Sequence, residues 1–366
     1  MPRIIRVLIV DDSALIRQLL TRALSMDPRI EIVGTAKTGV EAIEQARALS
    51  PDVITLDIEM PELSGLEALP HIRKCTDARV VMLSSLDDPD TTYRALALGA
   101  VDFIPKPAAG MASSITELAE LLLKTIRTAH RIDPSTAIAA LQSHVAEDVG
   151  ARGGDETFHP SDAPVAGAPL GACVAIASST GGPPVLERAF AGILGSLPAA
   201  YVVVQHLPAG FSASLARRLN NAGEVRVGEA KDGDVLESGR GYVVPHGRHM
   251  IVRRDGERFV LVTSDDPPMH GVRPAADVTL MSVAEQFGER AIGVVLTGMG
   301  ADGAEGALRI RKAGGDTVVQ DEATSVVWGM PGAAVRAGAA TRVVPAGLVA
   351  AEIRRAVRAR CEAGGA

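Results

Sequence analysis

The first third of the chain alternates short runs of β-branched residues with stretches in which apolar residues recur at helical spacing. Between Leu15 and Leu24 the apolar positions repeat at intervals of three and four residues, as in an amphipathic helix. Strands separated by helices indicate a parallel sheet built from βαβ units, with helices on both faces. The pattern predicts strands at Ile5–Val10, Ile30–Gly34, Val53–Asp57, Arg79–Ser84 and Val101–Ile104.

This pattern is lost between residues 134 and 170, where Ala, Gly, Pro and Ser occupy 19 of the 37 positions. Such a composition is typical of a linker. A weak helical piece opens it, at Ile138, Leu141, Val145 and Val149. We therefore expect one domain at residues 4–125, a linker at 126–169 and a second domain at 170–360.

After the linker the alternation of strands and helices resumes, which predicts a second α/β domain. Hydrophobic runs between residues 241 and 262, broken by Pro-His-Gly and Asp-Gly, predict an antiparallel hairpin added to a mostly parallel sheet. The fold class we expect is α/β with two doubly wound domains, the first a five-stranded flavodoxin-like sheet. The predicted strands of the second domain are Ala172–Ser178, Tyr201–Gln205, Gly241–Pro245, Met250–Arg253, Phe259–Val262, Ala291–Thr297, Thr317–Gln320 and Ala340–Val344.

Composition narrows the classes of function. A length of 366 residues exceeds the ~150 that one hydrophobic core usually serves, in agreement with two domains. The net charge of −7 offers no basic field for nucleic acid, and no apolar run approaches the ~18 residues of a membrane span. No signal-peptide cleavage site follows the N-terminus. Because Cys75, Cys173 and Cys361 are far apart, we expect neither a disulfide framework nor a zinc cluster. We therefore expect the protein to be cytoplasmic.

Polar residues follow the strands of the first predicted sheet. Asp11 and Asp12 end the first strand, Asp57 the third and Ser84 the fourth, and Lys106 follows the fifth. The carboxyl ends of parallel strands meet at one edge, so these side chains should converge. Neighbouring carboxylates repel unless they share a cation, and Mg²⁺ is the hard ion that suits them. Each residue alone could be a turn former or helix cap, but together they favour phosphoryl transfer to an aspartate.

The same segment closely resembles a two-component receiver domain. The resemblance rests on V-D-D-S at 10–13, L-D-I-E-M-P at 56–61, S-S at 84–85 and K-P at 106–107. It implies that a histidine kinase phosphorylates Asp57. It also implies Mg²⁺ held by Asp12, Asp57 and the Glu59 carbonyl, with Asp11 assisting. Ser84, Phe103 and Lys106 would be the switch positions.

In the second domain a strand ends at Ser178 and runs into Ser179-Thr180-Gly181-Gly182-Pro183-Pro184 before a helical stretch. Proline suits a first helical turn, and free N–H groups beside glycines form a donor nest for an anion. A serine placed there could attack a carbonyl whose oxygen then faces those N–H groups. The turn could equally be a phosphate-binding turn or a helix cap. It is not the G-x-S-x-G elbow of the α/β-hydrolases.

A nucleophilic serine needs a base and an orienting carboxylate. His206 ends the next predicted strand and should emerge at the same sheet edge, because adjacent strand ends lie about 5 Å apart. His246, His249 and His270 remain alternatives, and His206 itself could be an ordinary loop residue. Asp302 follows a later strand within Gly298–Gly303 and is our third member, although it could instead cap the helix that starts near Ala304.

Taken together, the motifs of the second domain closely resemble the chemotaxis protein-glutamate methylesterases. The motifs are I-A-S-S-T-G-G-P at 176–183, Q-H-L-P-A-G-F at 205–211, V-R-P-A-A-D-V at 272–278, L-T-G-M-G-A-D-G at 296–303 and Q-D-E-A-T-S-V-V-W-G-M-P at 320–331. Ala177 stands where the family usually has glycine, and Ala275-Ala276 replaces a serine-containing pair.

This second resemblance implies Ser179 as nucleophile, His206 as base and Asp302 as orienter. The substrate would be a methylated glutamate on the cytoplasmic helix of a chemotaxis receptor, with some receptor glutamines deamidated as well. The catalytic half would need no metal or organic cofactor. Phosphorylation would activate it.

Three other functions compete with this interpretation. A docking module for receptors or a kinase, without catalysis, would lack a member of the triad, whereas all three residues are present. A DNA-binding response regulator would need a basic helix-turn-helix, which the long second domain does not suggest. A generic serine esterase remains the enzymatic alternative.

Overall fold

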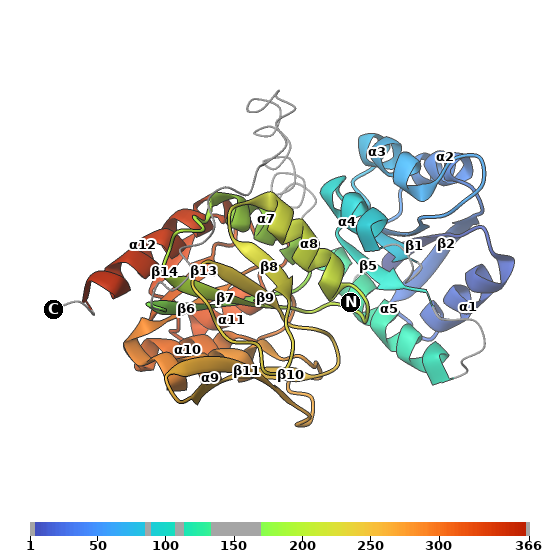
Figure 1. Cartoon of the computed structure of the whole chain (residues 1–366). Helices are drawn as coiled ribbons and strands as arrows, with labels where there is room; N and C mark the ends of the chain where they lie inside the picture. Colours follow the sequence, from blue (N-terminus) through green and yellow to red (C-terminus); the bar gives the residue numbers. More distant parts are fainter. Residues whose placement is uncertain (1–3, 85–88, 107–112, 133–169, 364–366) are drawn as a thin grey trace. The chain divides into compact units, whose positions relative to one another are not determined.

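The computed structural model describes four stretches of the chain, residues 4–84, 89–106, 113–132 and 170–363. The chain divides into two compact units, the first within residues 1–142 and the second within residues 143–366, and each is described by itself (Figure 1). Ser85, Pro107 and the weak helical piece predicted from Ile138 to Val149 lie outside the described residues. In the described residues no helix is long and apolar enough to cross a membrane.

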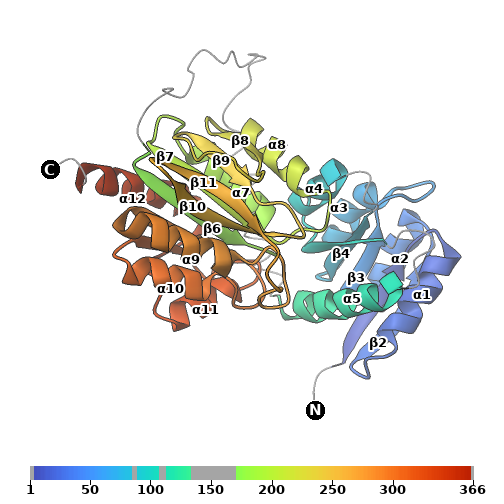
Figure 2. The same ribbon diagram turned by 60° about the horizontal axis from the view of Figure 1, so that its bottom comes forward.

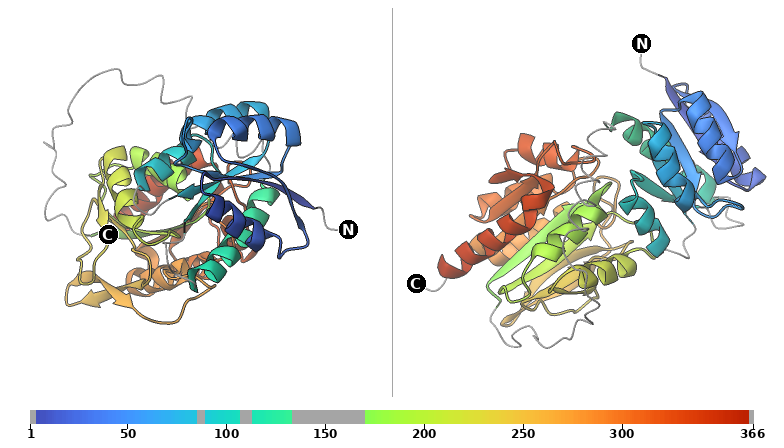
Figure 3. Two further views of the ribbon diagram at one scale, coloured as in Figure 1. Left: turned by 90° about the vertical axis from the view of Figure 1, so that its right-hand side faces the viewer. Right: turned by 90° about the horizontal axis from the view of Figure 1, so that it is seen from above.

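The described residues of the first unit form the expected five-stranded parallel sheet, in the order β2-β1-β3-β4-β5. Helices cover both faces, with α1 packed on α5 and α2 on α3 (Figure 3, right). Strands β1 (Ile5–Val10), β2 (Ile30–Ala36), β3 (Val53–Asp57), β4 (Arg79–Ser84) and β5 (Asp102–Pro105) alternate with α1 (Ala14–Leu24), α2 (Gly39–Leu49), α3 (Gly65–Cys75), α4 (Pro89–Ala97) and α5 (Ser113–Arg131).

Hydroxyl side chains start three of these helices. Ser13, Thr38 and Ser64 each accept a backbone N–H of the first turn, of α1, α2 and α3 respectively. The apolar face predicted for α1 is only partly buried. Leu15 is 65% exposed, and the sheet is covered by the C-terminal half of the helix, at Leu20, Ala23 and Leu24.

Helix α5 continues beyond residue 125, where the first domain was expected to end. Ile126, Ala129 and Ile132 are buried, and the guanidinium of Arg79 donates to the carbonyl oxygen of Ile132 at 2.8 Å. Residues 126–132 therefore belong to the first unit rather than to the linker, because the amphipathic face of α5 extends through them.

The described residues of the second unit form a seven-stranded parallel sheet, in the order β14-β13-β12-β6-β7-β9-β8. Helices α9, α10 and α11 pack together on one face (Figure 2), and α7 packs on α8 and α12. The strands of the sheet are β6 (Ala172–Ser178), β7 (Ala199–Gln205), β8 (Arg226–Glu229), β9 (Arg240–Val243), β12 (Ala291–Val295), β13 (Asp316–Gln320) and β14 (Arg342–Val344); the helices are α7 (Gly182–Gly192), α8 (Ser212–Ala222), α9 (Ala276–Phe287), α10 (Ala304–Lys312), α11 (Met330–Arg336) and α12 (Val349–Ala363).

The predicted antiparallel hairpin is confirmed as β10 (His249–Asp255) and β11 (Arg258–Ser264). It forms a separate two-stranded sheet that packs on α9, whereas β9, from the same stretch of sequence, joins the parallel sheet. Strand β8 was not predicted. It is four residues long and contains Gly228, and Val227 is its buried residue, so it carries little hydrophobic signal.

Candidate functional site

The two central strands of the second sheet bring Ser179 and His206 together. In the parallel pairing of β6 with β7, Ser178 is opposite Gln205, so the next residue of each strand leaves the sheet at the same level. The His206 N–H donates to the carbonyl oxygen of Ser178 at 3.1 Å. Gln205 adds a second link, since its Oε1 accepts the Ser178 hydroxyl at 2.7 Å.

The turn after β6 depends on two glycines. Gly181 has a φ of 76°, in the left-handed region, and a Cβ on it would lie 2.5 Å from Cβ of Val326. The Gly182 N–H donates to the carbonyl oxygen of Ser179 at 2.8 Å, and Pro183 follows within the first turn of α7. This member of the predicted donor nest is therefore engaged inside the turn itself.

Ser179 itself is half-buried against the loop that follows β12. Its N–H donates to the carbonyl oxygen of Thr297 at 3.0 Å. Gly298 comes so close that a Cβ on it would lie 2.8 Å from Cβ of Ser179 and 2.3 Å from Sδ of Met330. The position of the serine thus depends on the absence of a side chain at residue 298.

His206 and Asp302 are in hydrogen-bond contact. Nε2 of His206 lies 2.8 Å from Oδ2 of Asp302, and the two side chains are 14% and 2% exposed. Among the described residues, no hydrogen bond joins the Ser179 hydroxyl to His206. A ring that donates its Nε2–H to Asp302 keeps Nδ1 as the nitrogen able to take a proton.

The carboxylate of Asp302 occupies the N-terminus of α9. Oδ2 accepts the N–H of Ala276 at 2.6 Å, and Oδ1 accepts the N–H groups of Asp277 at 2.9 Å and Gly303 at 3.0 Å. The residue before α9 is Ala275, whose side chain offers no cap, and Asp302 takes that role. The alternative that Asp302 caps α10 is wrong, because Gly303 precedes α10 and provides no side-chain cap.

These contacts keep Asp302 ionised. Burial alone would raise the pKa of Asp302, but the hydrogen bonds from His206 and from the backbone of Asp277 and Ala276 outweigh it and hold the pKa below its usual value. An ionised, oriented carboxylate of this kind can stabilise a protonated imidazole beside it.

The other candidate histidines are engaged elsewhere. Nδ1 of His246 lies 2.9 Å from the Leu207 carbonyl. His249 is buried; its Nδ1 accepts the N–H of Ala275 at 3.1 Å and its Nε2 donates to the Pro267 carbonyl at 3.2 Å. His270 contacts Asp277, and these two side chains lie close to Asp302.

The first unit gathers its acidic residues as predicted. One carboxylate oxygen from each of Asp11, Asp12 and Asp57 lies within 4.8 Å of the others. Nζ of Lys106 is 3.0 Å from Oδ2 of Asp11 and 2.6 Å from Oδ2 of Asp57. Burial raises the pKa of Asp57 to about 6, against the opposing effect of Lys106.

A cavity of about 620 Å³ opens beside Asp12 and Glu59. Glu59 is exposed, and its N–H donates to Oδ1 of Asp57 at 3.3 Å. The hydroxyl of Ser84 is buried and shares a hydrogen bond with Thr92 at 2.5 Å. Phe103 packs edge-to-face on Tyr93, with 6.5 Å between the ring centroids.

Both units of the chain match families of known proteins. The family model described as CheB methylesterase matches residues 174–353, and the model of the response regulator receiver domain matches residues 7–116. A protein-glutamate methylesterase/protein-glutamine glutaminase of Pyrococcus abyssi is 41% identical over 361 residues, which cover 97% of this chain and 94% of that protein. The chain belongs to this family.

Two further relatives support the membership. A protein-glutamate methylesterase/protein-glutamine glutaminase of Xanthomonas campestris is 44% identical over 348 residues, covering 93% of this chain and 94% of its own. The crystal structure of the Thermotoga maritima CheB methylesterase catalytic domain is 37% identical, covers 50% of this chain and 97% of that domain, and superposes with a TM-score of 0.50. The chain is thus a methylesterase-family hydrolase with a response-regulator receiver domain, as its motifs predicted.

Three residues of the site escaped the sequence analysis. Gln205 contacts Ser179 and His206, and Gly298 packs against Ser179. These contacts join residues of different strands and loops, and the sequence alone does not show such contacts. Asp277 lies inside the V-R-P-A-A-D-V motif at 272–278, and its carboxyl is buried beside Asp302. The signal that could have found it is an acidic residue in an otherwise apolar first helical turn.

Proposed function

We propose that the second unit hydrolyses glutamate methyl esters on the cytoplasmic helices of chemotaxis receptors, and deamidates receptor glutamines, with Ser179, His206 and Asp302 as its triad. The observation that carries the proposal is the 2.8 Å contact of His206 with a buried Asp302, at the strand end next to Ser179. The names of the relatives support the choice of substrate.

The chemistry follows from these three side chains. The Ser179 hydroxyl turns towards Nδ1 of His206, gives up its proton there, and its oxygen bonds to the γ-carbonyl carbon of the substrate. His206 then gives that proton to the departing methoxy group, which leaves as methanol, or to the amide nitrogen, which leaves as ammonia. Water, deprotonated by the same nitrogen, hydrolyses the γ-glutamyl ester of Ser179 and restores the serine. Asp302 stabilises the imidazolium at both stages.

We further propose that a histidine kinase phosphorylates Asp57 and thereby raises the esterase rate. Receiver domains of this family typically bind Mg²⁺, and three hard carboxylate ligands clustered beside Lys106 fit that ion. Asp12, Asp57 and the Glu59 carbonyl would hold it, with Asp11 assisting. Bound there, the ion supplies positive charge that neutralises the phosphoryl group during transfer. Lys106, already paired with Asp57, and Ser84 would then contact the phosphoryl oxygens, and Phe103 would respond.

The test is methanol release from a methylated receptor cytoplasmic fragment. The full chain should release methanol, acyl phosphate with Mg²⁺ should increase the rate, and Asp57→Asn should abolish only that increase. Ser179→Ala should release none. A simple aliphatic ester offered at the same concentration should react far more slowly.

Two results would contradict the proposal. Equal rates on the receptor fragment and on the simple ester would indicate a generic esterase. Receptor binding without methanol release, in a well-folded full chain with acyl phosphate and Mg²⁺, would indicate a docking module instead.

A further inference from the structure

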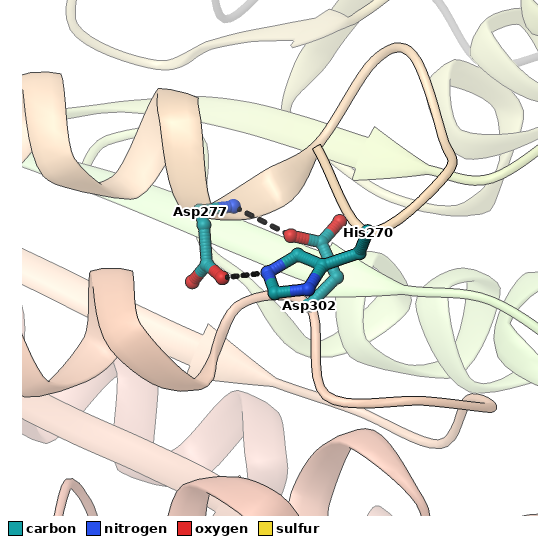
Figure 4. Close-up of side chains that lie close together, drawn as sticks. All are labelled: His270, Asp277 and Asp302. Carbon is teal, nitrogen blue, oxygen red and sulfur yellow. Dashed lines mark hydrogen bonds and ion pairs between the residues drawn. The ribbon is translucent and has the colours of Figure 1, made fainter. Parts of the chain in front are cut away.

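A second histidine–aspartate pair lies beside the triad. Nε2 of His270 is 2.7 Å from Oδ2 of Asp277, and one ligand atom from each of His270, Asp277 and Asp302 lies within 4.8 Å of the others. Figure 4 shows the three side chains converging from the loop before α9, the first turn of α9 and the loop before α10. The chemistry proposed above uses neither His270 nor Asp277.

The hydrogen bonds of this cluster join its carboxylates to the backbone at the start of α9 and α10, and we interpret them as structural contacts rather than as a metal site. Both oxygens of Asp302 accept two hydrogen bonds each, from the N–H groups of Asp277 and Gly303 on Oδ1 and from Ala276 and His206 on Oδ2. Oδ1 of Asp277 accepts the N–H of Gly306 at 2.7 Å, and its Oδ2 faces His270. Both oxygens of Asp302 are therefore fully used, and a cation could bind this carboxylate only by breaking one of these contacts.

Asp277 joins α9 to α10. Its side chain is 1% exposed and receives the Gly306 N–H from the first turn of α10, while its own N–H is donated to Asp302. The two helices meet closely because Gly306 has no side chain, and a Cβ there would lie 2.4 Å from Cβ of Leu280. Asp277 thus anchors α9 to α10 and donates its backbone N–H to Asp302, the carboxylate that contacts His206.

His270 closes the cluster on the solvent side. Its ring is 41% exposed, and its backbone φ of 55° is one that residues with side chains seldom adopt. Burial raises the pKa of Asp277, and the neighbouring Asp302 raises it further, whereas the Gly306 N–H and His270 act in the opposite direction. The imidazole therefore favours the charged form of Asp277, against the effects of burial and of the neighbouring Asp302.

We propose that His270 and Asp277 are positioning residues of the esterase. The pair fixes the first turn of α9 against α10, and so holds the N–H groups of Ala276 and Asp277 on the carboxylate of Asp302. This inference rests on the proposed triad. It assigns neither residue a contact with the substrate.

The experiment measures kcat and KM for methanol release by the full chain. Asp277→Ala removes the side-chain contacts that join α9 to α10 and should lower kcat about 30-fold or more, with KM within about twofold, because only the orientation of Asp302 is lost. Asp277→Asn keeps an oxygen for Gly306 and an amide for His270, and should restore kcat to within about fivefold of the unmodified chain. His270→Ala should lower kcat about fivefold.

The double variant His270→Ala/Asp277→Ala should be no slower than Asp277→Ala, since His270 acts through Asp277. Arg248→Ala is the matched control. Arg248 pairs at 2.7 Å with Asp265, which lies in the same loop as His270. Among the described residues no hydrogen bond or ion pair joins Arg248 to Asp302, so the kcat of Arg248→Ala should be unchanged. A Ser179→Ala chain that still hydrolyses the ester would remove the proposed triad itself.

The positioning role is overturned if kcat of Asp277→Ala stays within about twofold of the unmodified chain while Ser179→Ala is inactive. It is also overturned if the substitution raises KM alone, which indicates substrate contact, or if the two losses multiply in the double variant. Should Asp277→Ala fail to fold, His270→Ala decides. A kcat loss of at least about threefold at constant KM then supports the role, and a smaller loss contradicts it.

Discussion

Gln205 donates from Nε2 to the carbonyl oxygen of Ser179 at 2.9 Å. The same nitrogen lies 3.1 Å from the carbonyl oxygen of His206, and the amide oxygen accepts the buried hydroxyl of Ser178. One side chain therefore fixes the backbone of Ser179, the proposed nucleophile, to that of His206, the proposed base. The distance between them is set at the end of the rigid sheet rather than by the loops beyond it.

Replacing Gln205 by leucine should therefore reduce catalysis. The Ser178 hydroxyl would lose its acceptor in a buried position, which costs about 1–3 kcal/mol, and the Ser179 turn would be free to shift. We expect kcat to fall about tenfold or more and the melting temperature to drop. Gln286→Leu is the control, because Gln286 contacts the backbone of Arg254 away from the triad. Equal effects of the two substitutions would show that Gln205 has no special role.

Mutation can distinguish the proposed nucleophile, Ser179, from its neighbour Ser178 on β6. Ser179→Ala should abolish methanol release with the fold intact. Ser178→Ala should keep substantial activity, because Ser178 bonds to Gln205. The lost hydrogen bond leaves the buried Gln205 oxygen without its donor and costs about 1–3 kcal/mol of stability. Initial rates of both purified variants decide the matter. Full activity in Ser179→Ala would exclude it as the nucleophile.

Asp302→Asn should lower turnover by about three to four orders of magnitude and leave receptor binding intact. An amide has one acceptor oxygen, whereas the carboxylate accepts three backbone N–H groups as well as His206. The NH₂ group of the asparagine would face an N–H donor and could not accept its hydrogen bond. The uncharged amide also could not stabilise the imidazolium. Rate and binding are measured on the same receptor fragment, with Asp265→Asn, an exposed carboxylate, as the control. Unchanged turnover would remove Asp302 from the triad.

Gly298→Ala should impair turnover through crowding. The added methyl would lie 2.8 Å from Cβ of Ser179, a distance that requires the serine to move, and 2.3 Å from the more flexible Met330 Sδ. Such overpacking typically costs about 1–3 kcal/mol of stability, and we expect at least a tenfold loss of kcat. Gly228→Ala, where nothing lies within 4 Å of the new methyl, should change neither quantity. Wild-type kcat in Gly298→Ala would mean that Ser179 tolerates the displacement.

Asp57 should make the metal-free protein less stable as the pH rises. Its pKa is about 6 when folded and 3.8 when unfolded, so between these values the unfolded chain releases the proton first and stability falls. A difference of about two units corresponds to about 3 kcal/mol. Asp57→Asn should thus be more stable than the unmodified chain above pH 6 in EDTA, with the advantage vanishing near pH 4. Calorimetry of both proteins tests this, and an advantage independent of pH would contradict it.

The positions that end a strand could be predicted from the sequence. Asp57, Ser179, His206 and Asp302 each follow an apolar run, and the carboxyl ends of parallel strands meet at one edge regardless of strand order. The general rule therefore placed each of them correctly. It also favoured His206 over His246, His249 and His270, and the 2.8 Å contact with Asp302 supports that choice.

Residues that act across elements could not be predicted in this way. Asp277 reaches Gly306 and Asp302, 29 and 25 positions away, through a helix pair whose approach depends on a missing Cβ. Leu15 has the spacing of a core residue, yet it is exposed because only the later turns of α1 cover the sheet. Periodicity shows which face is apolar but not which part of that face is covered.

Because β6 lies between β12 and β7, the proposed triad is divided between two segments of the polypeptide. Ser179 and His206 follow β6 and β7, which precede the β10–β11 hairpin in the chain, whereas Asp302 follows β12, which comes after that hairpin. A single cut at the exposed hairpin turn around Gly256 would leave the first two residues on one fragment and Asp302 on the other. Neither fragment could then hydrolyse an ester alone, and recovered activity would report reassembly of the sheet from its two pieces.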